Sequence, residues 1–211
     1  MGSTTLVYAP EKTRQDLLEA AFEEVWQNGF RAASLDEILV RVGVTKGALY
    51  HHFHNKLELG YGVVEVVLRA RLLDKWINPM VEGEDPIIVL LTPQDRITDE
   101  EMAQYCRFGC PLLNLAQEMS PVDEGFRIRL DALYREWRQS ISDGLRRGQM
   151  NGQVRENINP EHAAVFYIAV IEGAIGMAKN AQNSDLLEPC MEGLTHYLEA
   201  LRPRRAFRGT G

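Results

Sequence analysis

The segment 46–51 combines positive charge, hydrogen-bonding rings and a bare stretch of backbone. Lys46 carries a cationic amine, Tyr50 and His51 carry polar rings, and Gly47 has no side chain. A lysine amine can donate to phosphate oxygens or to guanine O6 and N7, and a glycine lets the backbone approach another surface closely. Their spacing puts these groups on one outward face of a short helix, where they could bind a polyanion. The alternative interpretation is an ordinary solvated helix surface.

Hydroxyl residues and a glycine are expected to position this face. Ser34 and Glu37 form the S-x-x-E capping pattern, and Thr45 is placed to cap the helix that follows. Free amides and hydroxyls at helix N-termini bind phosphates, so Ser34 and Thr45 are further candidate contacts. Gly43 can leave a helix with positive φ at no steric cost. The pattern therefore predicts two short helices joined by a tight turn, which is the shape of a helix-turn-helix.

Apolar residues recur at helical spacing through almost the whole chain, and we see no convincing strand and no internal repeat. We predict an all-α fold of about nine helices, with an N-terminal three-helix helix-turn-helix DNA-binding domain and a C-terminal helical domain. The predicted helices are 12–28, 35–42, 46–53, 55–77, 99–109, 111–119, 122–150, 161–181 and 184–201. The predicted domains are 1–55 and 56–203, followed by a flexible tail at 204–211.

Two glycines fall inside the predicted helix 55–77, at Gly60 and Gly62. Each should cost about 1 kcal/mol relative to alanine in a helix interior. We consider two explanations, close packing against a neighbouring element and a soft point where the helix bends.

The charge distribution is uneven. The 211 residues carry a net charge of −7, which argues against a protein that coats nucleic acid nonspecifically. Residues 41–56 nevertheless contain three basic residues, three histidines and no acid, which favours a site-specific binder. We see no secretory signal and no apolar run near the roughly 20 residues of a membrane span, so we predict no membrane partner. Three cysteines, an odd number, favour a reducing cytoplasm.

The sequence VTKGALYHHFHNKLEL at 44–59, preceded by Gly29-Phe30 and by SLDEIL at 34–39, resembles the TetR family of transcriptional repressors. The resemblance implies a homodimer that binds a palindromic operator in double-stranded DNA and is released by a small effector. It implies that the C-terminal helical domain serves ligand binding and dimerisation. It also implies that Lys56 is a further phosphate contact. The predicted DNA-binding residues are thus Ser34, Thr45, Lys46, Gly47, Tyr50, His51 and Lys56.

Small and apolar residues crowd the helix 161–181, more than one buried stripe requires. With the helix 184–201 they resemble half of the family's four-helix dimer interface; the alternative is that both helices pack only within one subunit. The family's effector pocket would lie among the middle helices, for an apolar or aromatic compound. Its candidate residues are Trp76, Tyr105, Phe108, Leu112, Phe126, Tyr134, Trp137 and Tyr167.

Cys106 and Cys110 lie one helical turn apart and admit three interpretations. They could be small buried hydrophobes, or a thiol sensor of oxidants or electrophiles, since GCPLLNLAQEM resembles a TetR subgroup with a responsive cysteine. Zinc is disfavoured because no second ligand pair accompanies them, and we predict no metal and no cofactor. A remote alternative is an enzyme that uses Cys110 with His162, although no catalytic motif supports it. A third class of function is a helical interaction module that does not bind DNA.

Overall fold

The computed structural model describes residues 10–203, and within that range the chain is helical with no β-strand. The predicted all-α fold is therefore confirmed, and the predicted tail at 204–211 lies outside the described residues. The chain divides into two compact units. Unit one holds the described residues up to Ala70 together with Asn114–Leu130, and unit two holds Arg71–Leu113 together with the described residues from Asp131 onward.

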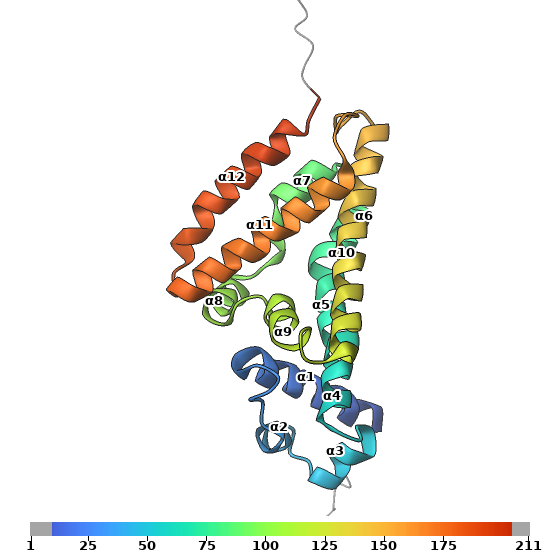
Figure 1. Cartoon of the computed structure of the whole chain (residues 1–211), viewed down its shortest axis with the longest axis vertical. Helices are drawn as coiled ribbons and strands as arrows, with labels where there is room; N and C mark the ends of the chain where they lie inside the picture. Colours follow the sequence, from blue (N-terminus) through green and yellow to red (C-terminus); the bar gives the residue numbers. More distant parts are fainter. Residues whose placement is uncertain (1–9, 204–211) are drawn as a thin grey trace, which may run out of the picture. The chain divides into compact units, whose positions relative to one another are not determined.

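Three helices begin unit one: α1 (Pro10–Asn28), α2 (Leu35–Val42) and α3 (Lys46–His52) (Figure 1). Their bounds agree with the predicted helices to within two residues. α1 packs against both others, and the buried side chains of the three helices include Leu17, Leu18 and Phe22 of α1, Ile38 of α2 and Leu49 of α3. Burial of such side chains is worth about 1.5–3 kcal/mol each. The core thus holds α2 and α3 at a set angle to each other.

The predicted caps of this region are present. The Ser34 hydroxyl accepts the amide of Glu37 at 3.3 Å, and the Thr45 hydroxyl accepts the amide of Ala48 at 3.3 Å. Gly43 adopts φ 75°, the left-handed conformation that a glycine reaches without strain. These local signals explain why the two helices begin and end where predicted.

In the capping box predicted at Ser34 and Glu37, the second hydrogen bond has a different acceptor from the one predicted. The Ser34 amide donates to Oε1 of Glu24 on α1 at 3.1 Å, and not to Glu37. Glu24 is buried and also lies 4.0 Å from the guanidinium of Arg41. A residue of the neighbouring helix therefore replaces the predicted local partner.

A continuous helical path follows, and it does not end at Ile77 as predicted. It consists of α4 (Lys56–Gly62), the π-helix η1 (Val63–Leu68), α5 (Arg69–Leu72), the π-helix η2 (Leu73–Ile77) and α6 (Asn78–Glu82). The amide of Asn78 bonds to the carbonyl of Leu73, five residues earlier. This wide turn explains the continuation, because it accommodates Pro79, which has no amide to donate.

Gly60 and Gly62 are explained by close packing. A Cβ at Gly60 would overlap the ring of Phe30 and lie 2.6 Å from Cζ of Phe126, and a Cβ at Gly62 would lie 2.8 Å from Leu18. Both contacts are shorter than real side chains tolerate. The first of the two interpretations therefore holds, although η1 does begin directly after Gly62.

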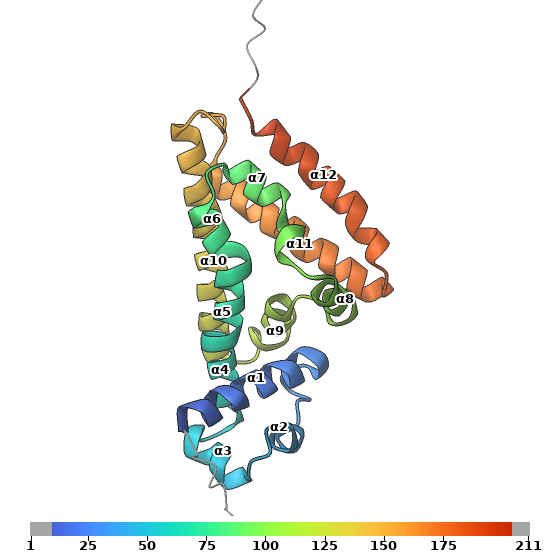
Figure 2. The same ribbon diagram turned by 180° about the vertical axis from the view of Figure 1, so that it is seen from behind.

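Unit two contains the C-terminal helices of the described chain and their neighbours. α11 (Pro160–Ala181) lies beside α12 (Leu187–Ala200), and α8 (Asp99–Phe108) packs on α11 while α7 (Pro86–Leu91) packs on α12 (Figures 1 and 2). The short helix α7 lies between the predicted helices 55–77 and 99–109. The short 3-10 helices are η3 (Pro93–Arg96) and η4 (Ser184–Leu186).

Three helices contribute residues to both units, and the first is α5, which is divided after Ala70. α9 (Pro111–Met119) enters unit one at Asn114, and α10 (Glu124–Met150) leaves unit one after Leu130. In unit two the core contains Ile87, Ile141, Leu145, Tyr167 and Leu198, none more than 1 % exposed.

α11 is long and apolar. Within residues 10–203 it is the one helix whose length and composition would also suit a membrane span, and 44% of its most apolar window is buried in the protein. The same properties fit a helix of a soluble protein that is covered on several sides.

Candidate functional site

The outward side of α3 carries the residues predicted to bind DNA. Leu49 and Phe53 are buried and seat the helix, whereas the side opposite to them is exposed. Tyr50 keeps 42% of its surface exposed, so its ring and hydroxyl can be reached from outside. We call this surface the α3 face; it consists of Thr45, Lys46, Gly47, Tyr50 and His51, all exposed.

Gly47 is not required by the packing of the protein itself. A Cβ at this position would find only the Thr45 hydroxyl, 3.8 Å away, and open space otherwise. This differs from Gly60, where a side chain would overlap its neighbours. A need for glycine at position 47 must therefore come from something that approaches from outside.

Ser34 and Lys56 are less exposed than the residues of the α3 face, and Lys56 already has hydrogen-bond partners. Ser34 is half-buried, and the Lys56 amine donates to the carbonyls of Ala33 at 2.6 Å and Arg31 at 3.1 Å. The amine also lies 5.2 Å from the centre of the Phe30 ring, and burial lowers the pKa of Lys56. An ammonium has three donors, so one remains for a phosphate. The structure adds a positioning role, because Lys56 holds the loop that leads into α2.

Glu118 holds the other side of the same loop, and the sequence analysis missed it. Its two carboxylate oxygens accept the amides of Phe30 and Arg31, each at 2.8 Å. Gly29 precedes them at φ 82°, and a Cβ there would lie 3.1 Å from Glu118. Hydrogen bonds to a charged group are the stronger kind, about 1.5–3 kcal/mol. No local pattern could have found this partner, which lies 88 residues away from Phe30.

Four of the predicted effector residues form an aromatic cluster in unit two. The ring of Trp76 lies 5.0 Å from that of Trp137 and 6.5 Å from that of Tyr167, and Tyr134 stacks on Trp137 at 6.5 Å. Such offset contacts between aromatic rings are favourable beyond the area they bury. The aromatic cluster is thus Trp76, Tyr134, Trp137 and Tyr167.

The other four predicted effector residues are distributed differently. Phe126 belongs to unit one, where its ring packs 4.7 Å from Phe30 and 5.1 Å from Tyr61. Its prediction as a pocket residue followed from the family resemblance and from its place in the middle helices, and it stays a prediction. Phe108 lies under the guanidinium of Arg107, and Leu112 and Tyr105 are buried and half-buried in unit two.

A buried carboxylate lies beside the aromatic cluster. Glu172 of α11 is 6% exposed, and its Oε1 accepts the Tyr134 hydroxyl at 3.1 Å and the Cys110 thiol at 3.4 Å. Burial raises the pKa of Glu172 to about 7, although the two hydrogen bonds act in the opposite direction. The sequence analysis missed this residue; an acidic side chain in the middle of an apolar helix is the signal that it overlooked.

The thiols are in surroundings that disfavour their charged form. Burial, together with the carboxylate of Glu172, raises the pKa of Cys110 well above its ordinary value, and burial also raises the pKa of Cys106. A reactive thiolate needs the reverse shift. His162, the proposed partner of Cys110 in the enzyme alternative, instead lines a surface hollow with Arg135 and Arg138.

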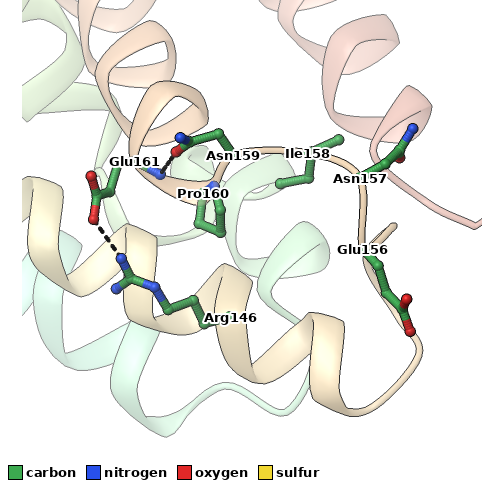
Figure 3. Close-up of a pocket in the computed structure, with 7 residues that line it drawn as sticks. All are labelled: Arg146, Glu156, Asn157, Ile158, Asn159, Pro160 and Glu161. Carbon is green, nitrogen blue, oxygen red and sulfur yellow. Dashed lines mark hydrogen bonds and ion pairs between the residues drawn. The ribbon is translucent and has the colours of Figure 1, made fainter.

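A polar surface pocket lies at the turn before α11, with a volume of about 420 Å³ (Figure 3). Across it Arg146 pairs with Glu161 at 2.6 Å, and Asn159 caps the helix through the amides of Glu161 and His162. None of the predicted effector residues lines it. The lining residues are Arg146, Glu156, Asn157, Ile158, Asn159, Pro160 and Glu161.

Two capped helices joined at a left-handed glycine, with an exposed cationic face on the second, define a helix-turn-helix DNA-binding protein. Residues 17–59 match the family model "Bacterial regulatory proteins, tetR family", and residues 97–194 match "Tetracyclin repressor-like, C-terminal domain". The chain therefore belongs to the TetR family of DNA-binding transcriptional regulators.

Individual relatives agree. The transcriptional regulator AcuR of Cereibacter sphaeroides is 32% identical over 168 residues, which cover 78% of this chain and 75% of the relative. The transcriptional repressor DhaR of Mycobacterium sp. strain GP1 is 28% identical over 192 residues, covering 90% and 92%. A TetR-family regulator from Cytophaga hutchinsonii shares the fold, with a TM-score of 0.83 at 19% identity over 94% of this chain and 99% of the other.

Proposed function

We propose that this protein is a ligand-responsive transcriptional repressor, not an enzyme, that binds a palindromic operator as a homodimer in the cytoplasm. The observation that carries the proposal is the α3 face, an exposed surface with a lysine, two polar rings and a glycine that internal packing does not require. Lys46 would donate to guanine or phosphate, and Tyr50 and His51 would contact phosphates and thymine methyl groups. Thr45, Ser34 and Lys56 would add phosphate contacts.

The exposed side of α11 supports dimerisation. Val165, Phe166 and Met177 are 53%, 44% and 49% exposed, and a Cβ at Gly173 or Gly176 would meet no atom within 4 Å. Large apolar side chains in one exposed stripe mark a surface that another protein covers. A second copy related by two-fold symmetry would bring α11 and α12 of each subunit into a four-helix interface.

The aromatic cluster supports an effector with an apolar or aromatic body, since rings supply large contact area at low entropic cost. Binding would release the operator only through a difference in affinity between two conformations of the dimer. The electrophile-sensing alternative, with Cys110 or Cys106 as the sensor, has less support, because both thiols have raised pKa values.

Selection of operators from a random duplex library with the purified protein tests the proposal. We expect enriched palindromes whose half-sites lie about 34–36 Å apart or a multiple of that distance. In a fluorescence anisotropy titration Lys46→Ala should lower affinity about tenfold and reduce the salt slope by about one. Arg127→Ala, which removes the same charge from an exposed side chain of α10, should change neither. Enrichment of no sequence, or of unpaired half-sites only, would contradict it.

A further inference from the structure

Two buried polar atoms at the aromatic cluster have no hydrogen-bond partner among the described residues 10–203. They are Oε2 of Glu172 and Nε1 of Trp137. Buried polar atoms in native proteins are nearly always paired, and each exception calls for an explanation. An acceptor and a donor left unpaired beside the same rings are explained most simply by a ligand that pairs with them.

Three neighbours of Glu172 are half-buried, so each keeps some accessible surface: Tyr105, Cys110 and Tyr134. A ligand could approach the carboxylate along these partly accessible side chains. Glu172 itself is positioned toward these residues by its bonds to Tyr134 and Cys110.

The chemistry around the carboxylate of Glu172 favours a positively charged ligand. A buried carboxylate is stabilised by a proton or by a cation, and the two hydrogen-bond partners of Glu172 are neutral. The faces of Trp76, Tyr134 and Trp137 attract cations as well. A carboxylate ligand would be repelled, and a neutral apolar ligand would leave Oε2 unpaired.

We propose that Glu172 is the polar anchor of the effector site and that the effector carries a protonated nitrogen on an aromatic or apolar body. This rests on the proposed function and narrows its effector class. The ammonium would donate to Oε2 of Glu172 while the body packs against the aromatic cluster.

Calorimetric titration with three probes of one shape tests the anchor: 1-naphthylmethylammonium, 1-naphthylmethanol and 1-naphthoate. We expect the ammonium to bind about tenfold or more tightly than the alcohol, and the naphthoate to bind least. Glu172→Gln should weaken the ammonium about tenfold and leave the alcohol nearly unchanged. Glu161→Gln, which removes the same charge from the exposed start of α11, should leave all three unchanged.

Thermal unfolding confirms that each variant is folded, and Glu172→Asp provides a second test, since it keeps the charge and should retain the preference for the ammonium. Equal binding of alcohol and ammonium, an unchanged ammonium affinity in Glu172→Gln, or no ammonium binding at millimolar concentration would overturn the proposal. Failure here is distinct from failure of the repressor function. Neutral aromatic compounds could release the operator equally well from the wild type and from Glu172→Gln. That outcome would support the repressor function and contradict the role of Glu172 as the anchor.

Discussion

Oε2 of Glu118, on α9, accepts the backbone amide of Phe30 at 2.8 Å, and Oε1 of the same carboxylate accepts the amide of Arg31. Lys56 holds the carbonyls of this loop from α4. The loop leads directly into α2, so its amides and its carbonyls are both restrained by charged side chains. Glu118 is therefore a positioning residue for the helix-turn-helix, although it belongs to the region matched by the C-terminal family model.

Glu118→Gln should lower operator affinity about three- to tenfold, because an amide can accept only one of the two bonds with the same geometry. The slope of log K against log salt should not change, since no phosphate contact is lost. Fluorescence anisotropy at several salt concentrations measures both quantities. Glu124→Gln, an exposed site bonded to Arg127, is the matched control and should behave as wild type. A reduced salt slope in Glu118→Gln would show instead that the variant also loses a phosphate contact made by a basic residue.

Gly47→Ala separates folding from DNA binding. Because a methyl group would reach only the Thr45 hydroxyl at 3.8 Å, the midpoint of urea unfolding should stay the same or rise slightly. Operator affinity should fall about tenfold or more if the DNA backbone lies against this position. Gly60→Ala is the contrast, since it should destabilise the protein by about 1–3 kcal/mol through overpacking. Unchanged operator binding by Gly47→Ala would argue against a close approach at α3.

Met177→Glu tests the exposed stripe of α11. A carboxylate at the centre of an apolar interface is costly, so we expect this variant to sediment as a monomer and to lose operator binding. Met150→Glu introduces the same charge at a side chain that is 79% exposed, at the end of α10, and should remain a dimer. If both variants stay dimeric, the interface lies elsewhere.

Glu172→Gln should change stability in a pH-dependent way. The pKa of Glu172 is raised to about 7 from an ordinary 4.5, so the native state resists its deprotonation and wild-type stability falls as pH rises through that window. Removing the ionisable group should therefore stabilise the protein at pH 8, by up to roughly 3 kcal/mol, and much less at pH 5. The pKa values of Cys110, Tyr134 and Tyr105 are raised, so these neighbours stay neutral across the window. Urea titrations at pH 5 and pH 8, at one protein concentration, measure the stability. An equal effect of Glu172→Gln at the two pH values would refute the prediction.

Much of the helix-turn-helix could be predicted because its signals are local. Ser34, Thr45 and Gly43 act on backbone groups within a few residues, and their roles follow from side-chain chemistry that needs no distant partner. The end of the fourth predicted helix was wrong for the opposite reason. Asn78-Pro79 is a local stop signal, and a π-turn that no local pattern reveals allowed the helix to continue.

The amino-acid sequence by itself determined the helical class, the caps and the composition of the α3 face, since periodicity and capping depend on neighbours along the chain. Only the tertiary structure decided which carboxylates bond to partners on other helices. Glu24, Glu118 and Glu172 acquire their partners through contacts between separate helices, and Phe126 was assigned to one unit and not the other in the same way. The energy of a buried charge depends on what surrounds it in space, and spacing along the chain carries no record of those surroundings.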